Sequence, residues 1–173
     1  MRTIWTVGHS TLPLEKFLEV VRDVEILADI RRFPGSRRHP QFSQESLRQA
    51  KAYRWFEAMG GRRSGATDRH PALRNKAFRA YAAHMDSPEF GEALRELEAL
   101  AAGRRTALLC AEGAWFRCHR RLLSDLLLAR GWGVLHLPGG RPHLLTPGAR
   151  ITEGRVEYDQ VEGPGDASGS GRS

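Results

Sequence analysis

Both cysteines of the chain and several basic residues lie close together, within residues 106–121. This stretch starts with the apolar run Ala107-Leu108-Leu109 and ends with Cys118-His119-Arg120-Arg121, after which leucines recur at helical spacing. The pattern predicts a buried strand, a turn and an amphipathic helix. Ligands of an open α/β sheet bind where strands end and the next helices begin. We therefore expect this connection to form the wall of a site.

Cys110, at the end of the predicted strand, is the candidate nucleophile. A cysteine at a helix N-terminus beside arginines has a lowered pKa, and the thiolate is its reactive form. His9 or His119 is then expected to act as acid or base, with Glu112 or Asp29 orienting it. Free cysteine is also among the most buried residue types, so the alternative is a purely structural Cys110.

Other chemistries fit this segment less well. The segment between Cys110 and Arg117 is longer than the phosphate-binding loop of tyrosine phosphatases and contains the bulky Trp115 and Phe116, which disfavours that mechanism. The spacing of Cys110, Cys118 and His119 matches no usual zinc site, so no metal is predicted. No dinucleotide or P-loop fingerprint occurs, and no cofactor is predicted. Two cysteines without a secretion signal favour free thiols in a reducing cytosol.

Strands alternate with helices along the chain, which predicts one three-layer α/β domain over residues 1–160, with a mostly parallel sheet flanked by helices. Residues 161–173 are rich in Gly and Ser and predict a disordered tail. Strands are expected over residues 3–7, 25–30, 53–56, 106–110 and 132–137, with an edge strand over 151–158. Helices are expected over residues 14–21, 43–52, 75–85, 87–100 and about 119–130. The first helix is expected to be capped by Ser10 or Thr11, and the first two strands to form a parallel pair.

Parallel strands bring their carboxyl ends to one edge of the sheet, where arginine forks and helix N-termini bind phosphate or carboxylate groups. The arginines expected at this edge therefore predict an anion site, with histidine, cysteine and carboxylate side chains beside it that can exchange protons. The loop arginines are expected to be solvated charges instead, namely Arg37, Arg38, Arg62 and Arg63. The alternative is a basic, aromatic strip that binds single-stranded nucleic acid, formed with Phe33, Phe42, Tyr53 and Trp55. The predicted catalytic residues are Cys110, His9, His119, Glu112 and Asp29, and the predicted substrate-binding residues are Ser10, Arg31, Arg32, Cys118 and Arg120.

The chain has 173 residues and a formal net charge of +7, and all but three of its 27 basic residues are arginine. Such a charge attracts phosphates and nucleic acid. No apolar run approaches the ~20 residues of a membrane span. The first residues also lack the apolar stretch of a signal peptide, so we expect a cytoplasmic protein without a membrane partner.

Several separated motifs, in the same order, resemble the domain-of-unknown-function 488 family over residues 3–158. The resemblance implies a compact, single-domain bacterial or archaeal protein with an α/β sheet, and a shared pocket for the motif positions named above. It implies no reaction. The motifs are Val7-Gly-His-Ser10, Asp29-Ile-Arg-Arg-Phe-Pro-Gly-Ser36 with Pro40-Gln-Phe42, Gly60-Gly-Arg-Arg63, Phe78-Arg-Ala-Tyr81 with Met85, and Leu109-Cys-Ala-Glu112 with Cys118-His-Arg120.

The leading hypothesis is an enzyme acting on a phosphate-bearing substrate, a nucleotide or nucleic acid, by hydrolysis or group transfer with a cysteine nucleophile. The alternative is a non-catalytic nucleic-acid-binding module in which the same residues only clamp a phosphate. A third hypothesis is a small-anion sensor or partner-binding protein, which would bind a mononucleotide and no polymer.

Overall fold

A six-stranded sheet in the order β3-β2-β4-β1-β5-β6 forms the centre of the computed structural model, which describes residues 2–160. Its neighbouring strands are parallel, except that β5 and β6 are antiparallel. The predicted mostly parallel sheet is therefore confirmed. The strands are β1 (Thr3–Gly8), β2 (Ile26–Asp29), β3 (Ala52–Trp55), β4 (Thr106–Cys110), β5 (Gly133–His136) and β6 (Arg141–Pro142).

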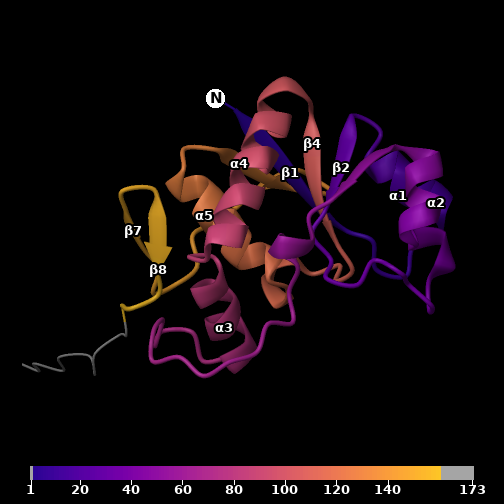
Figure 1. The fold of residues 1–173 in the computed structure, drawn as a ribbon. Coiled ribbons are helices and arrows are strands. Elements are labelled where there is room, and N and C mark those ends of the chain that lie inside the picture. The colour runs from indigo at the N-terminus through magenta and orange to yellow at the C-terminus, as the bar shows by residue number, and fades with distance from the viewer. Residues whose placement is uncertain (1, 161–173) are drawn as a thin grey trace, which may run out of the picture.

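Strand β4 lies in the middle of this sheet, between β1 and β2 (Figure 1). All five of its residues are buried, and a strand that is apolar on both faces is stable only where both faces are covered. The prediction that β1 and β2 pair directly was wrong, because β4 takes the place between them. The central position of β4 puts Cys110, its last residue, at the middle of the carboxyl edge.

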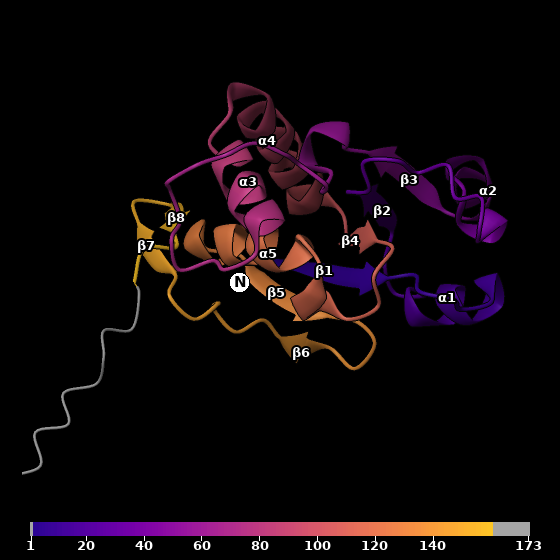
Figure 2. The ribbon, with the colours of Figure 1, turned by 90° about the horizontal axis from the view of Figure 1, so that it is seen from below.

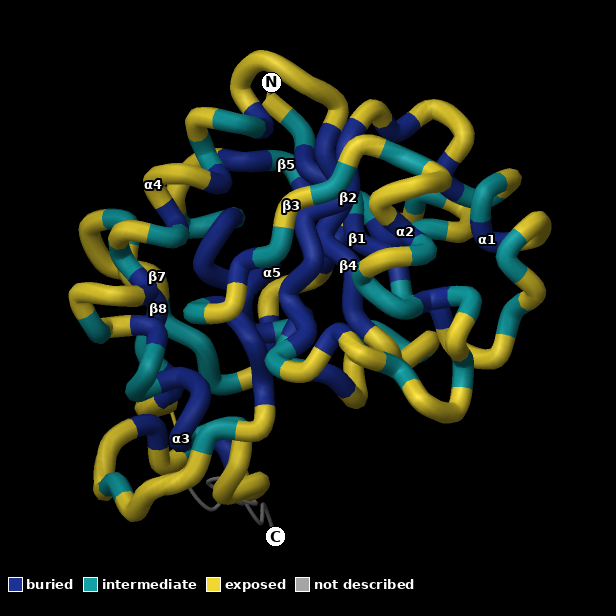
Figure 3. Tube along the Cα trace, turned by 45° about the vertical axis from the view of Figure 1, so that its right-hand side comes forward, coloured by how far each residue is buried: buried dark blue, intermediate teal, exposed yellow. Residues whose placement is uncertain are grey.

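Helices cover both faces of the sheet, as the three-layer prediction required (Figures 1 and 2). On one face, Phe17 and Leu47 pack with Leu109 in one core, and on the other face residues of α4 and α5 pack with Leu108 in a second core. The buried strands between the layers and the exposed connections are visible in Figure 3. The helices are α1 (Leu14–Val20), α2 (Gln44–Ala50), α3 (Lys76–His84), α4 (Pro88–Gly103) and α5 (Arg120–Ala129), with short 3-10 turns at Pro40–Phe42, Glu57–Met59 and Trp115–Arg117.

Side-chain caps fix the start of three helices. Ser43, Asn75 and Ser87 each accept a hydrogen bond from the first turn of α2, α3 and α4, respectively. The expected cap of α1 by Ser10 or Thr11 was wrong, because α1 has Pro13 at this position without a side-chain bond. Ser10 instead has a positive φ of 49° and donates its backbone N–H to the carbonyl of Ala111, so it belongs to the turn that joins β1 to the segment after β4.

The expected edge strand over residues 151–158 was also wrong. Two short strands, β7 (Arg150–Thr152) and β8 (Arg155–Glu157), form a separate antiparallel hairpin. Glu153 and Gly154 both have positive φ, which is the turn geometry that closes two-residue hairpins. The predicted disordered tail lies outside the described residues. Within residues 2–160, every helix is too short or too polar to cross a membrane.

Candidate functional site

The connection from β4 to α5 folds back so that the two cysteine sulfurs touch. Cys110 Sγ and Cys118 Sγ are 3.1 Å apart, and both residues are buried. A 3-10 turn over Trp115–Arg117 lies between them, and α5 begins only at Arg120. The prediction that Cys110 sits at a helix N-terminus was therefore wrong. Cys118, two residues before α5, occupies that position.

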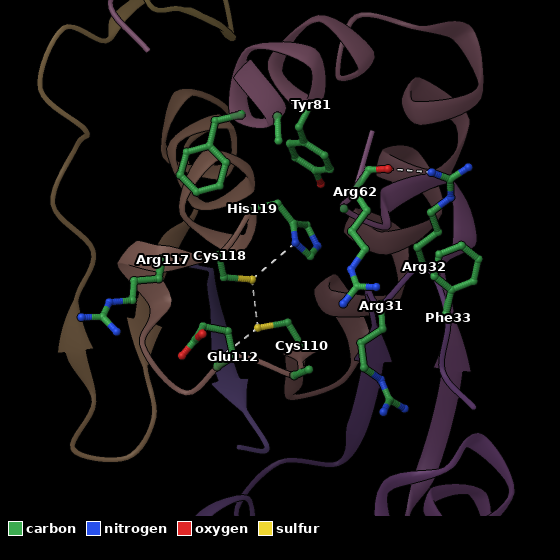
Figure 4. Close-up of a pocket in the computed structure, with 14 residues that line it drawn as sticks. Arg31, Arg32, Phe33, Arg62, Tyr81, Cys110, Glu112, Arg117, Cys118 and His119 are labelled. Carbon is green, nitrogen blue, oxygen red and sulfur yellow. Dashed lines mark hydrogen bonds between the residues drawn. The ribbon is translucent and has the colours of Figure 1, made fainter. Parts of the chain in front are cut away.

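A cavity of about 410 Å³ opens between the ends of β2 and β4 and helix α3 (Figure 4). Six of the ten predicted site residues line it, namely Arg31, Arg32, Cys110, Glu112, Cys118 and His119. The other four, His9, Ser10, Asp29 and Arg120, do not line it. The remaining lining residues are Phe33, Gly61, Arg62, Ala77, Phe78, Tyr81, Ala111 and Arg117.

Several of these additional lining residues had been given other roles from the sequence. Phe78 and Tyr81 were expected only as part of the helix over residues 75–85, and Arg62 was expected to be a solvated loop charge. In Figure 4 the Arg62 guanidinium reaches toward Cys110, whereas Arg117 points outward from the cavity. The motifs Gly60-Gly-Arg-Arg63 and Phe78-Arg-Ala-Tyr81, which carry the family resemblance, were the one signal that could have found them.

His119 is held in one orientation beside Cys118. Its Nδ1 lies 3.4 Å from Cys118 Sγ, and its Nε2 lies 2.9 Å from the carbonyl oxygen of Ile30. A carbonyl only accepts hydrogen bonds, so Nε2 carries a proton and Nδ1 faces the sulfur. The ring also packs edge-on against Tyr81 at 4.9 Å. Gly61 leaves room for it, because a Cβ there would lie 2.6 Å from His119 Nδ1.

The two thiols have opposite tendencies. The pKa of Cys118 is lowered by contact with the Cys110 side chain, by the neighbouring His119 ring and by the backbone N–H of Arg120, while burial raises it. Burial raises the pKa of Cys110, and so does the neighbouring charge of Cys118. These opposite shifts favour Cys118 as the sulfur that ionises, while the S–H of Cys110 donates to the carbonyl of Glu112 at 3.3 Å. The prediction of a lowered pKa at Cys110 was wrong because Cys110 is at the end of a buried strand, away from the helix start.

Asp29 does not orient a histidine. Its carboxylate accepts from Arg31 Nε at 2.9 Å and Arg31 Nη2 at 2.7 Å, and the hydroxyl of Tyr53 also donates to it. Arg31 in turn donates through Nη1 to the carbonyl of Phe42 at 2.7 Å. Most donors of this guanidinium are therefore occupied within the protein, and Asp29 is a support for Arg31 below the cavity.

His9 lies behind Arg31 and away from the cavity. Its Nδ1 is 2.8 Å from the carbonyl of Ser10, its Nε2 is 3.4 Å from Arg31 Nη1, and its ring stacks on Phe42 at 4.4 Å. Burial lowers the pKa of His9 to about 4, so the ring is neutral at pH 7. Of the two predicted acid–base histidines, only His119 lines the cavity.

Arg120 supports the loop between the cysteines. It is 1% exposed and donates through Nη2 to the carbonyls of Glu112 and Gly113 at 3.0 and 3.2 Å. Its Nε and Nη1 have no hydrogen-bond partner among residues 2–160. Glu112 is exposed and accepts the backbone N–H of Ala114.

A second histidine cluster lies between β1, β5 and α5. His136 Nδ1 is 2.6 Å from the hydroxyl of Thr6, and His136 Nε2 is 2.9 Å from His143 Nδ1. His143 Nε2 is 2.7 Å from Asp125 Oδ1, and Tyr158 donates to Asp125 Oδ2 at 2.7 Å. We call this cluster, from Thr6 through Tyr158, the buried relay. All five side chains are buried.

Comparison with known proteins identifies the family to which the chain belongs. The family model described as Domain of unknown function DUF488 matches residues 14–127, which confirms the resemblance found in the motifs. The chain has no significant match to a curated protein or to a solved structure. Within residues 2–160, no group of three or more His, Cys, Asp or Glu side chains is arranged to hold a metal ion.

Proposed function

The chain belongs to the DUF488 family, whose description states no reaction, and we propose from its cavity that it is a cysteine-dependent enzyme acting on an anionic, phosphate-bearing substrate. Cys118 is the nucleophile and His119 its base. The observation that carries this proposal is the contact of Cys118 Sγ with His119 Nδ1 at 3.4 Å, with His119 Nε2 fixed by the carbonyl of Ile30.

This arrangement supports nucleophilic chemistry because it contains the three parts that such sites need. They are a nucleophile, a base within reach of it, and a third group that holds the base in the correct tautomer. His119 Nδ1 takes the proton of Cys118 and returns a proton to the leaving group. The backbone N–H of Arg120 donates to Cys118 Sγ at 3.4 Å, which stabilises negative charge on this sulfur before substrate binds.

The charge of the cavity favours an anionic substrate. Arg32 and Arg62 line it, and Arg62 is exposed, so its guanidinium is available to a ligand. Arg31 adds positive charge from below, although its donors are largely used by Asp29. Guanidinium groups bind phosphate in two-point geometry. Phe33, which is 66% exposed, and the half-buried Phe78 offer an apolar surface to the rest of the substrate.

Alkylation of the cysteines tests this proposal without knowledge of the substrate. Iodoacetamide is neutral and iodoacetate is an anion, so their rate ratio reports the charge around the reacting sulfur. We expect Cys118 to be alkylated at pH 7 faster than free glutathione, to prefer iodoacetate relative to glutathione, and to be protected by inorganic phosphate or AMP. Cys118→Ser should abolish this reaction, while Cys110→Ser should preserve it. A Cys118 that reacts more slowly than glutathione with both reagents contradicts the proposal.

Catalysis itself is measured as phosphate release from a panel of nucleotides and phosphate monoesters. Wild-type protein is compared with Cys118→Ser, and a circular dichroism spectrum of each confirms the fold. Release by both proteins at the same rate excludes Cys118 as the nucleophile.

A non-catalytic nucleic-acid-binding module is the second candidate. The observation that favours it is a pair of exposed aromatic residues, each beside an arginine: Phe33 with Arg32 at 5.3 Å and Phe116 with Arg117 at 5.9 Å. Exposed aromatic and basic side chains bind single-stranded nucleic acid by stacking and charge. Fluorescence anisotropy with a single-stranded oligonucleotide over a salt series tests it. Under this alternative, binding is strong and salt-dependent, Cys118→Ser changes nothing, and no nucleotide turns over.

A further inference from the structure

The contact between the two sulfurs has a second chemical consequence. We propose that Cys110 and Cys118 form an oxidisable dithiol, in which Cys118 reacts with a hydroperoxide and Cys110 closes an intramolecular disulfide. This inference goes beyond the proposed function and does not depend on which substrate, if any, the cavity turns over.

The geometry requires little movement for this bond to form. The sulfurs are 3.1 Å apart, and a disulfide bond is about 2.05 Å long, so they must approach by roughly 1 Å. Cys110 is fixed at the end of the central strand, whereas Cys118 follows a short 3-10 turn whose residues are exposed or half-buried. The Cys118 side of the connection is therefore the part that moves.

The cavity also gives a hydroperoxide access to the pair. Both sulfurs line it, and its volume of about 410 Å³ far exceeds that of hydrogen peroxide. Only the thiolate attacks a peroxide at a useful rate. Cys118 Sγ accepts a hydrogen bond from the backbone N–H of Arg120 and lies 3.4 Å from His119 Nδ1, so Cys118 reacts first.

The reaction proceeds in two steps. The Cys118 thiolate attacks the outer oxygen of ROOH, the O–O bond breaks, and RO⁻ leaves as ROH with a proton from His119. Cys118 is thereby oxidised to a sulfenic acid and the peroxide is reduced. The Cys110 sulfur then attacks Cys118 Sγ, the S–O bond breaks, and the hydroxyl leaves as water with the proton of Cys110. Two thiols and ROOH give one disulfide, ROH and water, and a small-molecule thiol reverses the oxidation by exchange.

The disulfide changes the cavity in a predictable way. It removes the negative charge of the thiolate, takes Cys118 Sγ away as a nucleophile, and leaves His119 Nδ1 without its partner. A cysteine without a nearby thiol would instead stop at the sulfenic acid or continue to the irreversible sulfinic acid. The position of Cys110 protects Cys118 from this irreversible loss.

Peptide mass spectrometry of the full chain after hydrogen peroxide treatment tests the inference. The reduced protein takes up two iodoacetamide groups after denaturation, and the oxidised protein is expected to take up none until a reductant is added. In Cys110→Ser, the sulfenic acid on Cys118 should persist and be trapped by dimedone. In Cys118→Ser, loss of the remaining thiol should slow by on the order of tenfold or more, because Cys110 is not a thiolate.

Two outcomes overturn the inference: a wild-type Cys118 that goes to sulfinic acid without a disulfide, or a Cys118→Ser protein that oxidises as fast as wild type. Circular dichroism on each variant verifies its fold, and the wild-type measurement decides the matter even if a variant does not fold. Fast, phosphate-protected alkylation without a disulfide rejects this inference alone. A disulfide that forms while alkylation is slow and insensitive to phosphate rejects the proposed function alone.

Discussion

The molecule contains two places where a histidine is held between hydrogen-bond partners. They differ in whether an atom of the group remains accessible to a ligand. In the buried relay, Asp125 must accept from His143 Nε2, so His143 Nδ1 accepts from His136 Nε2, and His136 Nδ1 accepts from the hydroxyl of Thr6. Each ring nitrogen has a protein partner and both histidines are buried. At the cavity, His119 has one nitrogen on a carbonyl and the other on Cys118 Sγ, which faces open space.

This difference separates a structural from a chemical use of the same residue types. The relay joins β1 and β5 to α5 and to the segment that follows β8, so its hydrogen bonds stabilise the fold. The Cys118–His119 pair joins no strands or helices in this way, and its sulfur lines the cavity, where it can form a bond to a ligand. Disruption of the relay should therefore cost stability, and disruption of the pair should cost reactivity.

The largest expected effect is on stability, from Asp125→Ala. This change leaves His143 Nε2, the Tyr158 hydroxyl and the backbone N–H of Thr146 buried without their acceptor. We expect the free energy of unfolding to fall by about 3 kcal/mol, measured by urea denaturation. The control Asp23→Ala removes an exposed carboxylate and should change the free energy of unfolding by less than about 0.5 kcal/mol. An Asp125→Ala protein as stable as wild type contradicts a structural role for the relay.

The relay also predicts how stability depends on pH. Burial lowers the pKa of His136 to about 3, and the positive charge of Arg120 acts in the same direction. The folded protein therefore binds fewer protons than the unfolded chain, whose histidines titrate near 6.5. The stability from His136 is present above pH 6.5 and is lost as the pH falls from about 6.5 toward 3.

Replacement of His136 by Gln tests whether His136 lowers the stability as the pH falls. Between pH 6 and pH 4, we expect the variant to lose up to about 1.4 kcal/mol less per pH unit than wild type, because one proton no longer binds on unfolding. Above pH 7.5 the two pH dependences should run parallel. Parallel curves from pH 6 to pH 4 as well would show that His136 does not titrate on unfolding.

The sequence predicted the layers of this fold more accurately than the contacts of its site. Alternation of apolar strands and helices depends on neighbouring residues, so the sheet and the helix starts near Ser43, Asn75 and Ser87 were predictable. The position of β4 was open because pairing order depends on contacts across the whole chain. Its apolar run Ala107-Leu108-Leu109 was the available signal for a central place in the sheet.

The contacts within the site were also beyond what the sequence could predict. The sequence brought Cys110, Cys118 and His119 to one edge, but which sulfur becomes the thiolate depends on where α5 begins. The helix begins at Arg120, close to the expected start, so the favourable position belongs to Cys118, two residues before it, and not to Cys110. Likewise, the pairing of Asp29 with Arg31 is decided by the turn after β2, which residue types alone do not specify.

Gly61→Ala should reduce reactivity with little change in stability. The new Cβ would lie 2.6 Å from His119 Nδ1 and so displace the ring from Cys118. We expect iodoacetamide alkylation of Cys118 at pH 7 to slow on the order of tenfold, and its pH profile to move upward, because less of the sulfur is thiolate. Gly35→Ala is the matched control, since a Cβ at Gly35 meets nothing within 4 Å. Equal rates for the two variants would mean that contact with His119 does not activate Cys118.

The smallest effect is expected for the charge at the cavity mouth. Arg62→Ala should lower the preference of Cys118 for iodoacetate over iodoacetamide about two- to threefold at low salt, since one exposed charge near the sulfur is worth under about 1 kcal/mol. The difference should shrink at 0.5 M NaCl, where the Debye length is shorter than at low salt. Arg22→Ala removes an equal charge before the amino end of β2, at the opposite edge of the sheet, and should leave the preference unchanged. Equal losses in both variants would assign the anion preference to the net charge of +7 and leave the cavity without a specific role in it.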